Sequence, residues 1–93
     1  MKNSEFEWDN EKSRSNFRKH GVSFDEAATI FNDPRIATIS DSDHSEKEER
    51  YISTGMSVLL RLLTVVHAFR ESRIRLISAR KATKAEKKNY END

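Results

Sequence analysis

Residues 50–79 decide the fold, and their sequence is RYISTGMSVLLRLLTVVHAFRESRIRLISA. Three runs in this segment are rich in β-branched and apolar residues, as is typical of β-strands. They comprise residues 50–54, 60–69 and 73–79. Short polar breaks near 55–57 and 70–72 separate the runs. Because connections this short join antiparallel neighbours, the segment predicts a three-stranded meander.

Two helices are predicted before this meander. Asp9 can cap the first, over residues 10–20, and Gly21 is a typical residue for its end. Ser23 and Glu26 have the S-x-x-E spacing of a capping box, which predicts the start of the second helix. The apolar stripe of this helix recurs at i, i+3, i+4 and i+7. It comprises Phe24, Ala27, Ala28 and Phe31.

A short edge strand at 5–8, a strand at 36–39 and a final helix complete the pattern. Thr83 and Glu86 form a second capping box, which predicts a helix over 84–91. The order β-α-α-β-β-β-β-α predicts an α+β fold: an antiparallel β-sheet with two N-terminal helices on one face and a C-terminal helix. A chain of 93 residues fits a single domain spanning residues 1–93.

Charge is distributed unevenly along the chain. Residues 1–48 contain 7 Lys and Arg against 11 Asp and Glu, whereas residues 49–93 contain 10 against 5. The basic half suggests a polyanionic partner, and a solvated surface of mixed charge is the alternative. The absence of cysteine excludes disulfides, a thiolate nucleophile and Cys-ligated zinc, and it is compatible with a cytoplasmic location. The polar N-terminus and the interrupted apolar stretch 56–69 predict neither a signal peptide nor a membrane span.

Arginine dominates the basic residues of the predicted strands. Its planar guanidinium pairs with a phosphate through two hydrogen bonds, so arginines on a sheet face suit a bound phosphodiester. Strict alternation puts Arg73 and Arg75 on one face of their strand, and Leu76 and Arg80 on the other. The alternatives are protection of an edge strand and ordinary ion pairing, for example with acidic residues of the segment 46–49.

The loop 44–50 joins a titratable imidazole, several carboxylates and an arginine. A histidine near neutral pH can act as a general acid or base, and a carboxylate can orient it. A solvated loop without chemistry is the alternative, and a metal site at His44 lacks a recognisable ligand spacing. We expect His20 to cap a helix end, His67 to lie in the core and Tyr90 to pack the last helix onto the sheet.

Short blocks spread over residues 5–91 carry a resemblance to a known family. The longest are FEWD at 6–9, KHGVSF at 19–24 and ISARKAT at 77–83. Single matches between them include Asn16, Asp33-Pro34, His44-Ser45, Glu49-Arg50, Arg61, Glu86 and Tyr90. In these blocks and their spacing the chain resembles the BrnT family of type II toxins.

The resemblance implies a RelE-like α+β fold and a ribonuclease that arrests translation and growth. It also implies neutralisation by a BrnA-like antitoxin, which is encoded beside the toxin and carries a ribbon-helix-helix domain. The complex of the two would bind promoter DNA. Two positions depart from the family pattern, because Leu60 stands where Gly is common and Asn10 where Pro is common. Both departures concern local turn geometry rather than activity.

An RNA substrate carries its own nucleophile, the 2′-hydroxyl, so the expected reaction needs neither a metal nor a cofactor. We expect Arg50, Arg61 and Arg80 to stabilise the reacting phosphate, with Arg75, Lys81 and Tyr90 binding RNA. We expect His44 to do the acid/base chemistry, with Glu49 orienting or replacing it. Two alternatives are a module that binds RNA or antitoxin without cleavage, and a degenerate toxin that persists as a co-repressor.

Overall fold

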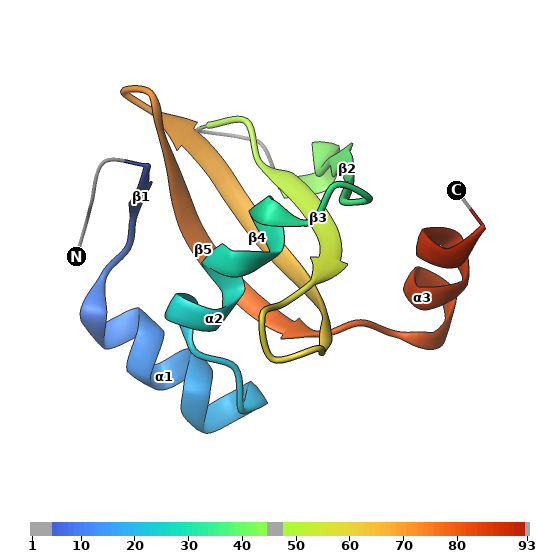
Figure 1. Cartoon of the computed structure of the whole chain (residues 1–93). Helices are drawn as coiled ribbons and strands as arrows, with labels where there is room; N and C mark the ends of the chain where they lie inside the picture. Colours follow the sequence, from blue (N-terminus) through green and yellow to red (C-terminus); the bar gives the residue numbers. More distant parts are fainter. Residues whose placement is uncertain (1–4, 45–47, 93) are drawn as a thin grey trace.

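The computed structural model describes residues 5–44 and 48–92. Five strands and three α-helices follow one another in the predicted order, with two short 3₁₀ segments, η1 and η2 (Figure 1). In chain order the elements are β1 (Phe6–Glu7), α1 (Asn10–His20), α2 (Phe24–Ala28), η1 (Thr29–Asn32), β2 (Ala37–Ser40), η2 (Ser42–His44), β3 (Tyr51–Met56), β4 (Leu62–Arg70), β5 (Arg73–Lys81) and α3 (Lys84–Glu91). The α+β fold is confirmed, and the bounds of α1 and α3 match the sequence expectation.

The sheet has the strand order β1-β5-β4-β3-β2. Strands β3 to β5 form the predicted three-stranded meander, and β2 extends it by pairing antiparallel with β3. The edge strand β1 differs, because it pairs in parallel with β5 through Phe6 and Ile74. Parallel pairing requires a long crossover connection. Helices α1 and α2 and strands β2 to β4 supply it here, and they return the chain to the edge where it began.

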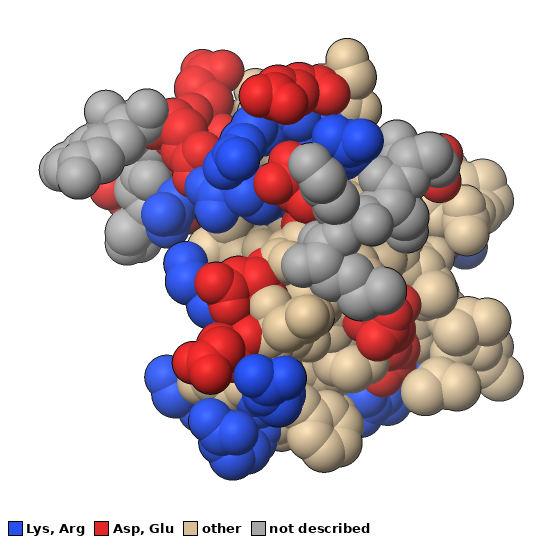
Figure 2. Space-filling model, turned by 90° about the vertical axis from the view of Figure 1, so that its left-hand side faces the viewer, with Lys and Arg blue, Asp and Glu red and all other residues tan. Residues whose placement is uncertain are grey.

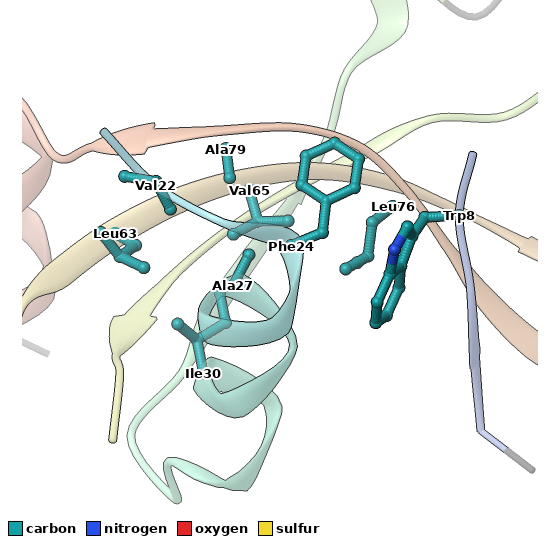
Figure 3. Packing of buried hydrophobic residues seen from close by; sticks show 9 residues of the cluster. All are labelled: Trp8, Val22, Phe24, Ala27, Ile30, Leu63, Val65, Leu76 and Ala79. Atoms are coloured by element: carbon teal, nitrogen blue, oxygen red, sulfur yellow. The ribbon is translucent and has the colours of Figure 1, made fainter. Parts of the chain in front are cut away.

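The hydrophobic core lies between the sheet and the segment formed by α2 and η1 (Figure 3). Phe24 is completely buried there, as predicted for the apolar stripe of this helix. Ile30 is also completely buried, although the predicted stripe contained Phe31 instead, because the chain continues after Ala28 as the tighter 3₁₀ segment η1. The remaining members of the cluster are Trp8, Val22, Ala27, Leu63, Val65, Leu76 and Ala79. Gly55 of β3 lies under η1, because a Cβ atom at this position would be 3.2 Å from the backbone and side chain of Ile30. This face of the sheet is called the helix face below.

Helix α1 runs beside β5 and is held there by a polar residue. Asn16 is buried, while the one strongly apolar residue of α1, Phe17, is exposed. The Asn16 side-chain amide donates to the backbone oxygens of Val22 and Ala79 and accepts from the Ala79 N–H. The side chain of Asn16 therefore continues the hydrogen bonding of the β5 edge beyond the end of β1.

A β-bulge interrupts the pairing of β4 with β5. Val66 pairs with Ser78 and His67 with Leu76, so Ile77 is an extra residue with no partner in β4. An extra residue reverses the alternation of side chains on one side of the bulge. As a result, the two ends of β5 present opposite sequence parities to the same face of the sheet.

Helix α3 lies on the side of the sheet opposite to α1 and α2, and it covers only one end of that face (Figure 1). Its Glu86 accepts hydrogen bonds from Thr64 of β4 and from Arg80 of β5. Tyr90 is buried, as expected, and its hydroxyl donates to Asp33. In the described part of the chain, no helix is long and apolar enough to cross a membrane.

Candidate functional site

The arginines of β5 gather on one face of the sheet, opposite α1 and α2. In antiparallel pairs the partners share a face, and Arg75 pairs with Ala68 while Arg80 pairs with Thr64. Ala68 and Thr64 lie four residues apart on β4 and so point to the same side. The expectation that Arg75 and Arg80 lie on opposite faces is therefore wrong, because the bulge at Ile77 realigns them. We call this side the open face.

Arg80 forms a bidentate ion pair with Glu86 at the end of the open face that α3 covers. Its Nη1 and Nη2 atoms donate to the two carboxylate oxygens over 2.8 and 2.9 Å. Mainly because of these hydrogen bonds, the pKa of Glu86 is lowered to about 2 and the pKa of Arg80 is raised. Glu86 also accepts from Thr64 and from the Thr83 N–H, so its carboxylate joins α3 to two strands.

Arg75 forms the second ion pair of the open face, with Glu48 at the end of the loop before β3. The side chains of Arg75 and Glu48 are 22% and 32% exposed, so solvent reaches this pair. The Nε atom of Arg75 is buried and has no hydrogen-bond partner among the described residues. Arg50 precedes β3 with the same parity as Ile52, which pairs with Val66, so its position also belongs to the open face.

Arg61 lies on the other side of the sheet, with the helices. Its guanidinium donates to both oxygens of the buried Glu26 and to the backbone oxygen of Gly21. Ser57 also donates to Glu26, over 2.7 Å. The hydrogen bond from Arg61 is the main cause of a lowered pKa of Glu26. This network ties α2 and the α1–α2 connection to the β3–β4 turn. Lys81 pairs with Leu63 and belongs to the same side.

The two acid/base candidates are His44 and Glu49, and the structure describes the side chain of Glu49 alone. The backbone of His44 belongs to η2, but its side chain lies outside the described residues. Glu49 is exposed and accepts from the Tyr51 hydroxyl over 3.0 Å. This hydrogen bond is the main cause of a raised pKa of Tyr51. The alternation of β3 directs Tyr51 to the helix face, where its ring stacks on His67.

His67 is a buried residue of the helix face, as the sequence predicts. Its Nε2 atom lies 2.7 Å from the Ser53 hydroxyl, and the ring is surrounded by Phe31, Tyr51 and Phe69. Burial lowers the pKa of His67 to about 4. The imidazole is therefore neutral at pH 7 and has no access to a substrate on the open face.

Tyr90 is positioned by the corner that follows η1. Asp33 accepts from its hydroxyl and from the backbone N–H groups of Met56 and Arg35. Burial acts to raise the pKa of Asp33, but these hydrogen bonds together leave it lowered. The Arg35 guanidinium lies 5.7 Å from the centre of the Tyr90 ring. The hydroxyl that could contact a phosphate is thus engaged in holding α3.

Acidic side chains accompany the basic ones on the surface. Figure 2 views the side that carries β1 and α1, and its Lys and Arg side chains lie next to Asp and Glu. Among the described residues, Glu48 and Glu86 are the carboxylates that pair with Arg75 and Arg80. The sequence suggested that arginines pair with carboxylates but did not identify each pair. The partners are 27 and 6 residues apart along the chain.

Comparison with known proteins identifies the family. A family model described as the ribonuclease toxin BrnT of type II toxin–antitoxin systems matches residues 8–86. The chain belongs to the BrnT family. The crystal structure of the Brucella abortus ribonuclease toxin BrnT superposes with a TM-score of 0.65 at 22% identity. That alignment covers 86% of this chain and 97% of the Brucella chain, and it supports the shared fold. A search of curated proteins gave no match.

Membership in the BrnT family confirms the resemblance seen in the sequence blocks. It makes the chain a member of a family of ribonuclease toxins, which implies an RNA substrate and an antitoxin partner. The matched region extends from Trp8 to Glu86 and so includes every strand of the meander and both ion pairs of the open face.

Proposed function

We propose that this chain is an endoribonuclease toxin that binds RNA on the open face and cleaves it without a metal ion. The observation that carries the proposal is the bulge at Ile77, which brings Arg75 and Arg80 to one side of the sheet with Arg50. Guanidinium groups on a sheet face bind phosphates through two hydrogen bonds each. Membership in a ribonuclease toxin family supports RNA as the polymer.

In the proposed reaction the 2′-oxygen of the substrate attacks the adjacent phosphorus, and the bond to the 5′-oxygen breaks. The base that takes the 2′-proton is His44, with Glu49 orienting or replacing it, and the leaving oxygen receives a proton. Arg50 and Arg80 stabilise the charge that develops on the phosphoryl oxygens. Loss of one such contact should lower the rate on the order of 10²–10³-fold. The products are a 2′,3′-cyclic phosphate and a 5′-hydroxyl.

The remaining sequence candidates enter the proposal mainly as positioning residues. Arg61 is held by Glu26 on the helix face, and Tyr90 is held by Asp33 beneath α3. Both set the positions of elements that border the open face. Lys81 is exposed at the end of β5 but belongs to the helix side, so it assists phosphate binding only where the RNA passes that end of the strand. Arg75 binds RNA only after Glu48 has left its guanidinium, so the phosphate competes with a carboxylate of the same chain.

The proposed partner is a BrnA-like antitoxin with a ribbon-helix-helix domain, which neutralises the toxin in the cytoplasm and carries the complex to promoter DNA. The excess of Lys and Arg in residues 49–93 favours an acidic segment of this partner. Val58, Leu59 and Leu60 are strongly exposed at the β3–β4 turn and favour an apolar contact. Active toxin released from the complex would arrest translation and growth.

One observation favours a second candidate, a non-catalytic module that binds RNA or antitoxin and serves as a co-repressor. Arg75 and Arg80 are both paired with carboxylates of the same chain. A sheet face whose charges are already compensated can serve stability alone. The two candidates differ in what a substitution changes. In a nuclease it lowers the rate of cleavage, whereas in a non-catalytic module it only weakens binding, in a salt-dependent way.

The deciding experiment incubates the purified protein with total RNA in EDTA and then with translating ribosomes. Arg75→Ala and Arg80→Ala are compared with the wild type, and Arg14→Ala on exposed α1 is the matched control. Cleavage by the wild type and the control, with loss in the two variants, is expected. Thermal melting of each variant separates loss of the fold from loss of chemistry, since Arg80 also holds α3.

Two results would contradict the proposal. Absence of cleavage by the wild type under both conditions favours the co-repressor. Cleavage that persists in both arginine variants places the reacting phosphate away from the open face. As an internal test, Glu48→Gln should raise RNA affinity, because it releases Arg75 from its carboxylate partner.

A further inference from the structure

The outer edge of β5 carries a groove that the proposed site does not use. It has a volume of about 210 Å³ and lies between α1 and β5. Its lining residues are Lys12, Ser15, Asn16, Lys19 and His20 of α1 with Ile77 and Ser78 of β5. None of these residues is acidic, and the groove is called the α1–β5 groove below.

The position of the groove follows from how the β5 edge is covered. β1 pairs only with Ile74 and Arg75, and the Asn16 side chain bonds to Ala79. The edge between these two contacts contains the bulged Ile77 and forms the floor of the groove. A bulge leaves its extra residue outside the ladder. The groove is therefore a break in edge pairing, bordered by cationic side chains.

The cations of the groove differ from those of the open face in their pairing. Within the described part of the chain, neither Lys12 nor Lys19 forms a salt bridge, whereas Arg75 and Arg80 each do. Lys12 and Lys19 are separated by two turns of α1, or about 10 Å along the helix axis. Both are exposed, so an anion in the groove could reach them without breaking a salt bridge. Backbone hydrogen bonds are the main cause of the lowered pKa of Asp9, and the charge of Lys12 also contributes to it.

The groove is continuous with the proposed site. A neighbouring hollow of about 280 Å³ shares Lys12 with the groove. Its other lining residues include the basic Arg70 and Arg75 and the acidic Glu7 and Asp9, and Glu7 pairs with Arg70. The two hollows follow consecutive stretches of β5, and Ser78 of the groove shares the open face with Arg75. A chain of phosphates crossing the open face at Arg75 can therefore pass Lys12 and enter the groove.

We infer that the α1–β5 groove binds backbone phosphates of single-stranded RNA beyond the stretch that lies on the open face. This inference rests on the proposed function for the identity of the polymer. The groove supplies ammonium groups and hydroxyls, which recognise phosphate without reading the base. It extends the RNA footprint from the open face around the β5 edge, and it makes affinity depend on the length of the RNA.

The test uses a fluorescein-labelled 2′-O-methyl decanucleotide, which lacks the nucleophile and so reports binding without cleavage. The variant carries Lys12→Gln and Lys19→Gln, and the matched control carries Arg14→Gln and Arg18→Gln. The control residues belong to the same helix but line a different hollow. Both double variants lose the same charge, and all four side chains belong to exposed residues, so neither change should prevent folding.

We expect about a tenfold loss of affinity for the groove variant in low salt, with a log–log salt slope shallower by about 1.4, the value for two phosphate contacts on a single strand. The control should retain both its affinity and its slope. A trinucleotide too short to span both sites should bind the groove variant and the wild type equally. Ser15→Asp adds a carboxylate to the groove, so this single variant should bind the decanucleotide more weakly than the wild type.

Equal losses in the two double variants would overturn the inference, because net charge alone would then explain binding. Unchanged affinity in the groove variant would overturn it as well, as would a wild type that does not bind the decanucleotide. Cleavage of total RNA is measured separately. A wild type that cleaves RNA but shows no groove effect refutes only the groove, whereas a groove effect without any cleavage refutes only the nuclease.

Discussion

Two helices of this chain begin with the same local motif, and the structure uses the two motifs differently. At α3, the Thr83 hydroxyl accepts from the Glu86 N–H and the Glu86 carboxylate accepts from the Thr83 N–H, so the capping box is complete. At α2, the Ser23 hydroxyl accepts from the Glu26 N–H, but the Glu26 carboxylate is bound by Arg61 and Ser57. The expectation of a full capping box at α2 is therefore half wrong.

The difference comes from the position of the arginine. Arg80 is six residues before Glu86 and reaches it while Glu86 still faces its own helix start. Arg61 is 35 residues after Glu26 and approaches from the β3–β4 turn, beneath α2. A buried charge must be paired, and this requirement outweighs a cap hydrogen bond at the surface. The motif thus fixes where a helix begins, and the tertiary partner decides how its glutamate is used.

The largest expected effect separates the two glutamates by substitution. Glu26→Gln leaves a half-buried arginine and a buried serine poorly paired, so we expect a loss of about 3 kcal/mol in the free energy of unfolding. Glu86→Gln affects a more exposed pair and should cost about 1 kcal/mol. Urea denaturation of both variants measures the difference. Equal losses would mean that burial does not distinguish the two pairs.

A pH titration extends the comparison, because acid protonates both glutamates. The contribution of His67 to the pH dependence of stability must first be distinguished from theirs. The unfolded His67 side chain binds a proton below pH 6.5, whereas the folded one does so only near pH 4. The unfolded state therefore holds more protons in this window, and stability should fall by about 2–3 kcal/mol as the pH falls from 6.5 to 4.

The His67→Gln variant should show little change between pH 6.5 and pH 5, since its side chain does not titrate. The ion pair of Glu86 stabilises the fold at neutral pH, because its pKa is about 2 in the folded state and 4.5 ordinarily. This stabilisation is lost as the pH falls below 4.5. Guanidinium denaturation across this range checks both windows. A wild type whose stability is constant from pH 6.5 to pH 5 would contradict the burial of a neutral imidazole.

The caps themselves should be of similar strength, which isolates the glutamates as the source of the difference. Ser23→Ala and Thr83→Ala each remove one hydroxyl acceptor, and each should cost about 1 kcal/mol. Thermal denaturation compares the two variants under the same conditions. A much larger loss in one of them would show that its hydroxyl does more than cap its helix.

The smallest expected effect concerns the turn that carries Arg61. Leu60 has a positive φ of 62° and an 83% exposed side chain. Leu60→Gly removes the strain and should raise stability by about 0.5–1 kcal/mol, because the relief exceeds the added freedom of the unfolded chain. Leu59→Gly is the control, since Leu59 has no positive φ. A gain in both variants would contradict this origin.

The sequence predicted the elements well because their signals are local. Asp9 caps the start of α1 and Gly21 caps its end, while Thr83 caps the start of α3. Each cap forms hydrogen bonds with residues only a few positions away. Strict alternation over residues 61–67 also puts Arg61 and His67 on the side of the buried Leu63 and Val65, where the structure has them. The chemistry of the site could not be predicted in the same way, because it depends on contacts between distant residues.

Two features show where prediction from the sequence ended. The bulge at Ile77 has no marker such as Gly in the sequence, yet it turns Ser78 and Arg80 to the face of Arg75. The buried role of Asn16 was equally hidden, because a polar residue on a polar helix gives no sign of the strand edge 63 residues away. Both depend on how α1 and β4 pack against β5.

The sequence by itself determined the order of helices and strands, the positions of the helix ends and the family, because these follow from local patterns and from short blocks and their spacing. Only the tertiary structure decided which arginines share a face, which carboxylate each one binds and where an unpaired basic groove remains. The physical reason is that a β-strand alternates with a period of two, so a single extra residue reverses every assignment beyond it. Such a residue is fixed by packing across the sheet rather than by its own neighbours in the chain.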